Sequence, residues 1–428
     1  MTSQDLHDRH RSALPRWVTT YYEQPLHPVS ATGRTIIDAH GRPHLDFFAG
    51  ILTNSLGYGV AEFRRALDRQ LDTGIAHTST LYLIDAQVRL AERLAEQSGI
   101  DDAVVFFVNS GTEANDTALL AATCHTGGNH VIALTDGYHG RSLTSTAVSG
   151  LPGWQPSPYS PFHVTFASNG RTSPDGEEHP PEDPVADLEA RLAGLAPPAA
   201  LIVEPVQGLG GFHTPPTALL QQYARIAAQH GAVLICDEVQ TAWGRTGRAW
   251  WGHQLHQLKP DVITFAKGIA NGLPLGGVIA RREILDSVPG KSISTFGGNP
   301  LACTAALATL DHILDHGLQR NAEKTGQILL DELLRLSGAH PHLRNPRGQG
   351  LMLAVDIVDP HTGRPDPGAA VAHVEACRAN GLLIGIGGRH GNTLRIAPPL
   401  TVTEEEVAEA ARILAAAAQH CAPTSASA

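Results

Sequence analysis

Short apolar runs alternate with helix-like segments between about residues 85 and 300. The runs occupy 103–108, 130–135, 163–167, 199–204, 232–237 and 261–266. Nearly continuous apolar stretches of this length are typical of strands buried on both faces, and the segments between them can supply crossover helices. The pattern therefore predicts an α/β fold with a mainly parallel sheet.

The two ends of the chain have a different pattern. Residues 33–50 ("GRTIIDAHGRPHLDFFAG") predict a hairpin. After about residue 305, helix-like stretches alternate with the runs "GQGLMLAVDIVD", "GLLIGI" and "NTLRIAPPL", which predicts a smaller α+β unit. We therefore expect an N-terminal arm over 1–60 that contributes to the small domain and the active site, a large domain over 61–304 and a C-terminal small domain over 305–428.

Three local signals complete this outline. Thr403 and Glu406 have the spacing of a capping box, so the last helix should begin there. Residues 169–184 are rich in Pro, Gly and charge and predict a surface loop. The tail at 422–428 ("APTSASA") predicts disorder.

Composition argues against several classes of protein. No apolar run approaches the roughly 20 residues that a membrane helix needs, and the polar N-terminus lacks the apolar stretch of a signal peptide. The net charge of −11, without a basic cluster, makes nucleic acid a poor partner. Five widely spaced cysteines with no CxxC indicate a reducing cytoplasm.

The 23 histidines raise the question of a metal. The local pairs are His253/His256 and His312/His316, and neither has a Glu or Asp arranged as in a metal-binding helix motif. We expect both pairs to be solvated surface histidines and expect no metal.

A single lysine ends the last of the apolar runs. Lys267 follows residues 262–266 and precedes a Gly-rich turn. It could be an ordinary strand-end lysine whose stem lies on apolar surface. Alternatively, it could be held in a pocket to form an imine with a carbonyl group. The stretch alone favours the first interpretation.

Other predicted strands are followed by residues that could bind a ligand. Ser110, Gly111 and Thr112 stand at the start of a predicted helix, where free N–H groups and the helix dipole suit a phosphate, although Ser and Thr are also ordinary N-caps. Tyr138 offers a flat ring and Arg141 a fork for a carboxylate; a core aromatic and a surface arginine are the alternatives.

Asp237 ends another buried strand. An unpaired carboxylate would be costly there, so a cationic partner is expected. The protonated nitrogen of a pyridine ring would serve, and an Asp facing that nitrogen together with a Schiff-base lysine is the arrangement of pyridoxal phosphate enzymes.

With these residues in view, the chain resembles the class III aminotransferases, pyridoxal 5'-phosphate enzymes of fold type I. The resemblance runs from about residue 25 to 415 and rests on six motifs in the family's order: "NSGTEAND", "DGYHGRS", "EPVQGLGG", "CDEVQTAWGRTG", "FAKGIANGLPLGG" and "TFGGNPLAC". It implies a large domain with a seven-stranded sheet, a small C-terminal domain, and Lys267 and Asp237 as catalytic residues.

The resemblance also implies a set of cofactor-binding residues. These are Ser110, Gly111 and Thr112 at the phosphate, Tyr138 and Val239 on the two ring faces, Asp237 at the ring nitrogen, Gln240 near the phenolic oxygen, Lys267 at the imine and Thr295 at the phosphate of the neighbouring subunit. A residue that reaches the neighbour implies a homodimer with shared active sites, possibly a dimer of dimers.

Three residues are implied on the substrate side. Arg395 matches the position that binds the α-carboxylate, Glu204 belongs to the "EPVQG" motif, and Arg141 either grips a second, distal carboxylate or is structural. Many glutamate-using relatives carry an acid where this chain has Leu209. That departure favours pyruvate or glyoxylate over 2-oxoglutarate as acceptor, with an amino acid or ω-amine as donor, as in the alanine–glyoxylate and ω-amino acid branch.

Three rival functions stay open. An isomerase (an aminomutase or amino acid epimerase) shares the fold and the lysine. An amino alcohol phosphate phospholyase also resembles this branch. A regulatory, ligand-sensing module would need an attached DNA-binding domain, for which neither end has room.

Overall fold

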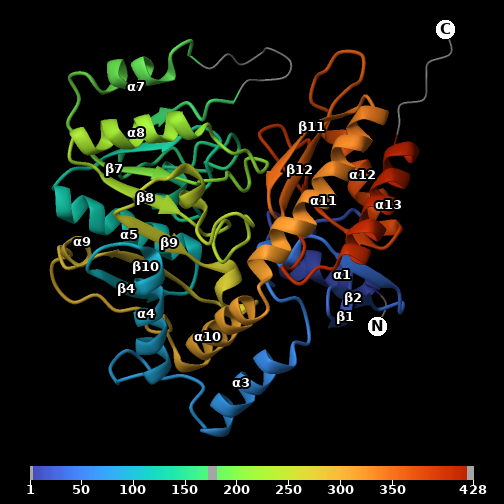
Figure 1. The fold of residues 1–428 in the computed structure, drawn as a ribbon, viewed down its shortest axis with the longest axis horizontal. Helices are drawn as coiled ribbons and strands as arrows, with labels where there is room; N and C mark the ends of the chain where they lie inside the picture. Colours follow the sequence, from blue (N-terminus) through green and yellow to red (C-terminus); the bar gives the residue numbers. More distant parts are fainter. Residues whose placement is uncertain (1–2, 172–180, 422–428) are drawn as a thin grey trace.

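The computed structural model describes residues 3–171 and 181–421. Most of the surface loop predicted at 169–184 and the whole tail at 422–428 therefore lie outside the described residues. Figure 1 shows two bodies side by side, one built around a large sheet and one formed by the C-terminal part of the chain with the N-terminal segment beneath it.

The large sheet has seven strands in the order β4-β10-β9-β8-β7-β5-β6. Their bounds are β4 (Ala103–Val108), β10 (Gly276–Arg281), β9 (Val262–Phe265), β8 (Val233–Asp237), β7 (Pro198–Val203), β5 (His130–Leu134) and β6 (His163–Ala167). The six predicted strands and the mainly parallel sheet are confirmed. β10, the antiparallel strand between β4 and β9, was not predicted.

The missed strand begins with two glycines, which are poor strand formers. They are needed because the backbone passes close to its neighbours: a Cβ at Gly277 would lie 2.5 Å from the Phe265 ring. Close approach, not strand propensity, fixes the sequence there.

Helices cover both faces of this sheet. Alternate residues of each strand point to opposite faces. Val131 and Ala133 of β5 pack with α5 (Gly111–Thr126), while Ile132 and Leu134 pack with α7 (Pro184–Leu192) and α8 (Thr217–Gln229). The lower part of the body in Figure 1 holds α3 (Ala61–Asp72), α4 (Asp85–Ser98) and α10 (Pro300–Asp315). Burial on both sides thus explains the apolar runs of β5, β7, β8 and β9, whereas the edge strands β4 and β6 are only partly buried.

The C-terminal body has an antiparallel sheet in the order β11-β12-β15-β14. Its elements are β11 (Leu343–Gln349), β12 (Met352–Ile357), β14 (Gly385–Gly387), β15 (Thr393–Ile396), α11 (Leu318–Ala339), α12 (Pro367–Ala379) and α13 (Glu404–His420). The predicted capping box is confirmed, since Thr403 N donates to Glu406 at 3.0 Å and Glu406 N donates to Thr403 at 3.3 Å.

The N-terminal segment joins this second body. It contains α1 (Ser3–Ala13), β1 (Pro28–Thr32), β2 (Thr35–Asp38) and β3 (Pro43–Asp46), and β3 pairs in parallel with β13 (Leu382–Leu383). The predicted hairpin at 33–50 is confirmed as β2–β3. Arg34 also pairs with Glu406 at 2.8 Å. The domain boundaries given above stay a prediction.

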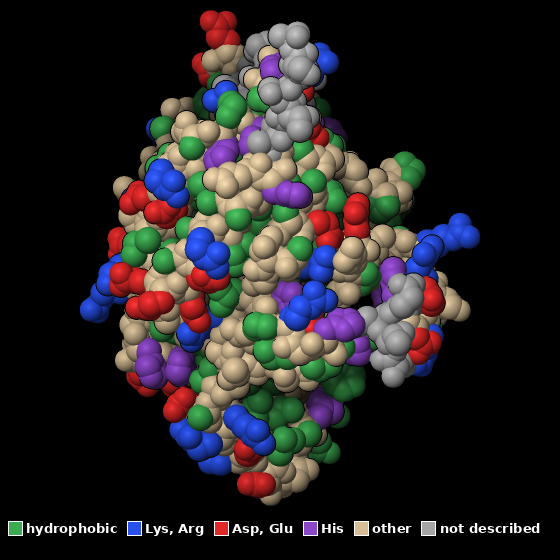
Figure 2. Space-filling view, turned by 90° about the vertical axis from the view of Figure 1, so that its right-hand side faces the viewer, with side chains coloured by type: hydrophobic (Ala, Val, Ile, Leu, Met, Phe, Trp, Pro, Cys, Tyr) green, Lys and Arg blue, Asp and Glu red, His purple; other side chains and the backbone are tan. Residues whose placement is uncertain are grey.

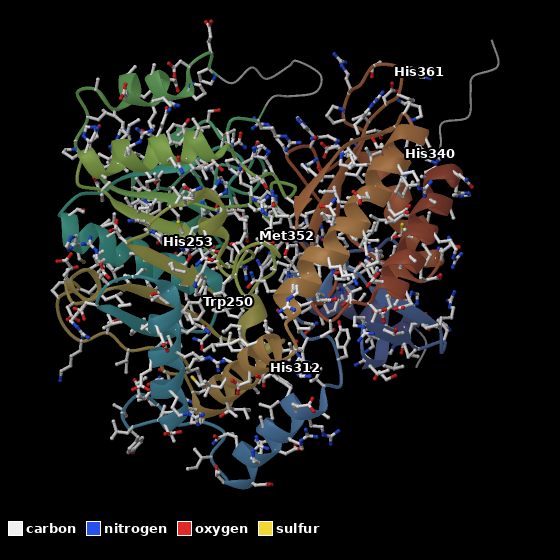
Figure 3. All side chains as sticks on the ribbon, in the orientation of Figure 1. Trp250, His253, His312, His340, Met352 and His361 are labelled. Atoms are coloured by element: carbon white, nitrogen blue, oxygen red, sulfur yellow. The ribbon has the colours of Figure 1, made fainter. Side chains whose placement is uncertain are left out.

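One pair of histidines differs from expectation. His253 and His256 are buried, not solvated, and Figure 3 labels His253 inside the large body. Their loop folds back onto buried Glu238, whose carboxylate lies 2.9 Å from His253 Nδ1, while His256 Nε2 lies 2.8 Å from the Pro205 carbonyl oxygen. A buried carboxylate needs such donors.

On the face drawn in Figure 2, acidic and basic side chains are interspersed. Within residues 3–171 and 181–421, no helix is both long and apolar enough to cross a membrane. In the same part of the chain, no three His, Cys, Asp or Glu side chains lie together so as to hold a metal ion.

Candidate active site

The carboxyl ends of the parallel strands meet at one edge of the large sheet, and a cavity of about 370 Å³ opens there. Because β4 and β9 are both antiparallel to β10, the end of β4 reaches the same edge. Nine of the predicted site residues line the cavity: Ser110, Gly111, Thr112, Tyr138, Glu204, Asp237, Val239, Gln240 and Lys267. The lining residues do not include Arg141, Thr295 or Arg395.

Lys267 enters the cavity from a strained position. It follows β9 and opens the 3₁₀ turn Lys267–Ala270 with φ 47°, in the left-handed region that non-glycine residues rarely adopt. Within the described residues its Nζ atom has no hydrogen bond. Burial lowers the pKa of Lys267 to about 8, helped by Arg395 and opposed by Asp237 and Glu204. The amine is therefore unusually free to react.

Asp237 is held by three donors at the end of β8. Asn115 Nδ2 and His139 Nδ1 each lie 2.8 Å from its Oδ2 atom. The Val239 amide donates to Oδ1 at 3.1 Å. Thr264 in turn donates to Asn115 Oδ1 at 2.7 Å, which fixes the amide so that its nitrogen faces the carboxylate. Oδ1 keeps the greater capacity to accept a further bond.

Sequence reasoning missed Asn115 and His139 as parts of the site. Both stand inside motifs already quoted, "NSGTEAND" and "DGYHGRS", so a signal was present. Burial alone would lower the pKa of His139, but the hydrogen bond and charge of Asp237 raise it overall. Its Nε2 atom is buried without a partner among the described residues.

Ser110 caps the N-terminus of α5. Its side chain accepts from the Glu113 amide at 3.2 Å, and the helix runs for 16 residues, so its free N–H groups and dipole point toward the cavity. A Cβ at Gly111 would lie 2.9 Å from the Val239 side chain. Only glycine lets this turn approach Val239 so closely.

Tyr138 and Gln240 also line the cavity. The Tyr138 amide donates to Glu204 Oε1 at 2.8 Å, and its ring meets the Trp154 ring edge-on at 5.3 Å. Gln240 Oε1 is buried without a partner in the described part of the chain. That unsatisfied amide end indicates room for a hydrogen-bonding group of a ligand.

Glu204 directly follows β7 and lines the cavity. Its second oxygen accepts from the Gly208 amide at 2.8 Å. Burial raises the pKa of Glu204 to about 7, and the charge of Asp237 adds to this, while His139 opposes it.

The remaining predicted residues lie around the cavity. Arg395, on β15, is buried, and its NH1 atom donates to the Gly208 carbonyl oxygen at 3.2 Å. Burial lowers its pKa. Arg141 is exposed, with its guanidinium carbon 5.4 Å from the centre of the Trp17 ring. Thr295 is exposed in the loop before α10.

A model of the class III aminotransferase family matches residues 19–418. The chain is 35% identical to the acetylornithine aminotransferase of Methanothermobacter thermautotrophicus, over 92% of this chain and 94% of that one. It is 33% identical to the mitochondrial alanine–glyoxylate aminotransferase 2 of Homo sapiens, over 94% and 83%. An alanine/serine racemase of Pyrococcus horikoshii is 34% identical, over 91% and 85%.

The solved structures that resemble this chain also include more than one kind of enzyme. An aminotransferase of Bacillus anthracis superposes with a TM-score of 0.88 at 29% identity, over 98% of both chains. A phospholyase from Arthrobacter, in complex with phosphoethanolamine, superposes with a TM-score of 0.88 at 28% identity, over 97% of this chain and 99% of that one. The relatives thus include aminotransferases, a racemase and a phospholyase on one fold.

Proposed function

The chain belongs to the class III aminotransferases, which depend on pyridoxal 5'-phosphate, and from this premise we propose that it moves an amino group from an amino acid or ω-amine to an oxo acid. The two substrates react in turn, in a ping-pong sequence. The observation that carries the proposal is the Lys267 amine, which has no hydrogen bond within residues 3–171 and 181–421 and shares one cavity with Asp237 and the N-terminus of α5.

The cavity suits the cofactor at each of its polar groups. Ser110, Gly111 and Thr112 would hold the phosphate at the helix N-terminus. Asp237 Oδ1 has capacity to accept from the ring N–H, and Gln240 Oε1, which has no partner within the described residues, would accept from the phenolic hydroxyl. Tyr138 and Val239 would pack on the two ring faces.

When bound, pyridoxal phosphate supplies an aldehyde that exchanges its amine partner and a ring that withdraws electrons. Lys267, with its lowered pKa, is uncharged more often near neutral pH and attacks a carbonyl carbon as nucleophile. The free Nζ atom of Lys267 would take a proton from the donor carbon and hold it for return. Asn115 and His139 hold the Asp237 carboxylate, which would pair with the ring nitrogen.

Acceptor choice follows from Arg395. Its guanidinium offers a fork for one carboxylate, and Leu209 supplies no acid to compete for it. 2-Oxoglutarate would need a second cation, for which we name only Arg141, which lies exposed against Trp17. We therefore propose pyruvate or glyoxylate as the better acceptor.

The five free cysteines are in keeping with the proposed cytoplasmic location.

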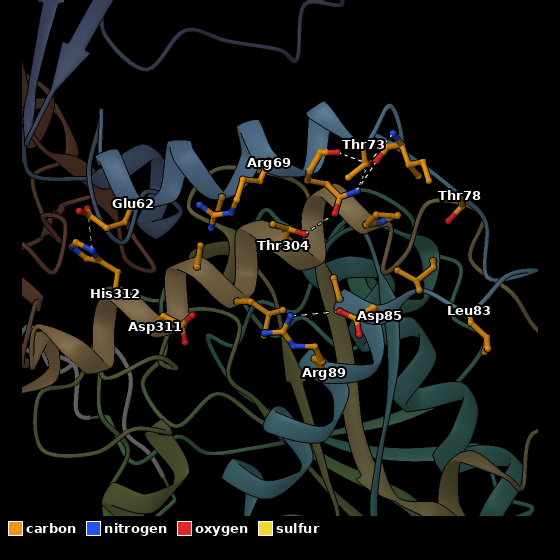
Figure 4. Close-up of a pocket in the computed structure, with 18 of the residues that line it drawn as sticks. Glu62, Arg69, Thr73, Thr78, Leu83, Asp85, Arg89, Thr304, Asp311 and His312 are labelled. Atoms are coloured by element: carbon orange, nitrogen blue, oxygen red, sulfur yellow. Dashed lines mark hydrogen bonds and ion pairs between the residues drawn. The ribbon is translucent and has the colours of Figure 1, made fainter.

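We also propose a homodimer with shared active sites, possibly a dimer of dimers. Thr295 lies outside the cavity of its own chain, beside Phe296, which is 60% exposed. A groove of about 910 Å³ is bordered by α3, α4 and α10, and Figure 4 shows that most of its labelled side chains are charged or polar. Its lining also includes Ile75, Tyr82 and Leu83, which are exposed, and exposed apolar side chains close together favour a partner surface. A fully active monomer in sedimentation under assay conditions would contradict the dimer.

The test is a spectroscopic cycle with purified protein. An amino donor should bleach the absorbance of the lysine-bound cofactor, and an oxo acid should restore it. A racemase would interconvert isomers of one amino acid without an oxo acid, and a phospholyase would release phosphate. Either result, without the cycle, would replace the proposed reaction.

A further inference from the structure

Arg395 is held by aromatic rings and carbonyl oxygens. Its guanidinium carbon lies 4.9 Å from the centre of the Phe48 ring and 5.5 Å from the centre of the Phe212 ring. Nε donates to the Ile386 carbonyl oxygen and NH1 to the Gly208 carbonyl oxygen, each at 3.2 Å. We refer to Phe48, Phe212, Gly208 and Ile386 as the Arg395 cage. Among the residues described, no carboxylate forms an ion pair with Arg395, although it is only 3% exposed.

The backbone fixes each ring. Phe48 follows β3 and precedes the left-handed turn α2 (Ala49–Leu52), where Asp46 Oδ1 accepts from the amides of Phe48 at 3.0 Å and Ala49 at 2.8 Å. Phe212 has φ 53°, also in the left-handed region. Such a conformation is unfavourable for a bulky residue, so the surrounding structure must hold it in place.

The Phe48 and Phe212 rings are also held by packing. They belong to one buried apolar cluster, made of Phe48, Leu52, Val206, Phe212, Met352, Ala354 and Ala397. Figure 3 labels Met352 where the two bodies meet. The cluster therefore joins the N-terminal segment, the large body and the C-terminal body. Close-packed side chains have few alternative rotamers, so the rings cannot shift without moving the bodies apart.

An acid and a cage would hold an arginine with different consequences. An arginine paired with an acid is neutralised until a substrate carboxylate displaces that acid. The cage holds Arg395 through carbonyl dipoles and ring faces, which carry no net charge. The Tyr21 hydroxyl and the charge of Glu204 also act on Arg395 and raise its pKa against the effect of burial, but neither forms an ion pair with it among the described residues. Its positive charge thus stays available to a substrate carboxylate. The same contacts oppose any swing of the side chain away from the site.

We propose that Phe48 and Phe212 are positioning residues that hold Arg395 as a fixed carboxylate receptor, so that both the donor and the acceptor must bring a carboxylate of their own. A substrate with a carboxylate gains a charge-assisted contact with this fixed cation, and an amine without a carboxylate gains none. Such amines are therefore poor donors. This inference rests on the proposed function, in which Arg395 binds the carboxylate.

The experiment uses the holoenzyme with the variants Phe48→Leu and Phe212→Leu. Each removes a ring from Arg395, and we expect the KM for pyruvate to rise about tenfold while kcat at saturating pyruvate stays within about twofold. The rate with benzylamine relative to L-alanine should rise, because Arg395 can then turn away. The absorbance of the lysine-bound cofactor should not change.

Two controls separate positioning from a merely structural role. Phe47→Leu removes a neighbouring, fully buried ring that packs in the main core, so it should lower stability without changing the KM for pyruvate. Phe48→Tyr keeps a ring beside Arg395 and should restore the parent KM. If Phe212→Leu does not fold, Phe212→Met gives a side chain closer in volume.

The variant Arg395→Leu separates this inference from the proposed function. If it leaves the KM for pyruvate unchanged, Arg395 is not the carboxylate receptor and both proposals fail at that residue. If it raises the KM while the ring-removing variants behave like Phe47→Leu, the cage is overturned and the receptor role stands.

Discussion

The two ends of the site hold their buried cations in opposite ways. Lys267, at the cofactor end, has no hydrogen bond to its amine within the described residues and sits in strained backbone. Arg395, at the carboxylate end, has two carbonyl acceptors and two aromatic faces. In the proposed roles, the cation that would react is left unsatisfied, whereas the cation that would bind a carboxylate is held.

The pKa values follow the same contrast. Burial lowers the pKa of Lys267 to about 8, within reach of neutral pH. Burial also lowers the pKa of Arg395, but a guanidinium starts so high that it stays charged. A lysine at the cofactor end can therefore serve as an uncharged nucleophile, whereas an arginine at the carboxylate end keeps a permanent charge.

The largest effect is expected at the cofactor end. Lys267→Ala removes the nucleophile and proton carrier, so turnover should fall to background while the fold and the phosphate site remain. Borohydride reduction of the parent followed by peptide mapping should place the cofactor on Lys267. A label on another lysine would refute the assignment.

The second-largest effect is expected for Asp237. Asp237→Ala should lower kcat by several orders of magnitude, because the ring nitrogen loses the carboxylate that keeps it protonated. Some cofactor should stay bound, since the helix N-terminus at Ser110 is intact. Steady-state kinetics with saturating cofactor measure this, and activity within about tenfold of the parent would contradict the role.

A smaller effect is expected at the carboxylate end. Arg395→Ala should lower kcat/KM for every oxo acid by about 10- to 100-fold, the cost of an unmade charge-assisted contact of roughly 1–3 kcal/mol. The parent should prefer pyruvate or glyoxylate over 2-oxoglutarate by a similar factor. Both are measured by varying three acceptors at a fixed donor.

The variant Arg141→Ala decides between the two interpretations of that arginine. If it is structural, acceptor preference should not change. If the parent prefers 2-oxoglutarate and Arg141→Ala removes that preference selectively, Arg141 binds the distal carboxylate. The argument from Leu209 would then fail.

The two ends also differ in how far the sequence predicts them. At the cofactor end, the residues that follow the predicted apolar strands do line one cavity, because parallel strands bring their ends to one edge. Their roles were inferred from the family resemblance, and Asn115 and His139 were missed. The carboxylate end brings together Phe48, the segment from Gly208 to Phe212, and Ile386, which are far apart in sequence. Gly208 stands in a quoted motif, but nothing in the sequence connects it or the two rings with Arg395, so the contacts that hold Arg395 needed the folded chain.

Two further misses have the same origin. β10 escaped prediction because contacts with Phe265 require glycine where propensity favours larger residues. His253 and His256 were wrongly expected at the surface because burial of Glu238 depends on a loop closing over it. In each case a tertiary contact overrides the local pattern.

The smallest predicted effect tests the contrast between the two cations through stability, in cofactor-free protein. Lys267 has a folded-state pKa of about 8 against an ordinary value of 10.5, so the folded state disfavours its charged form. This cost is fully present below pH 8 and disappears as pH rises through 10.5. Lys267→Met should therefore raise Tm by a few degrees at pH 7, and by less at pH 9.5.

Arg395→Met should instead lower Tm at both pH values, because the carbonyl oxygens of Gly208 and Ile386 lose their donor in a buried site. Thermal unfolding of the three proteins at the two pH values gives the answer. Two variants that shift Tm in the same direction would show that both cations are held alike, and the contrast between a reactive and a fixed cation would have to be abandoned.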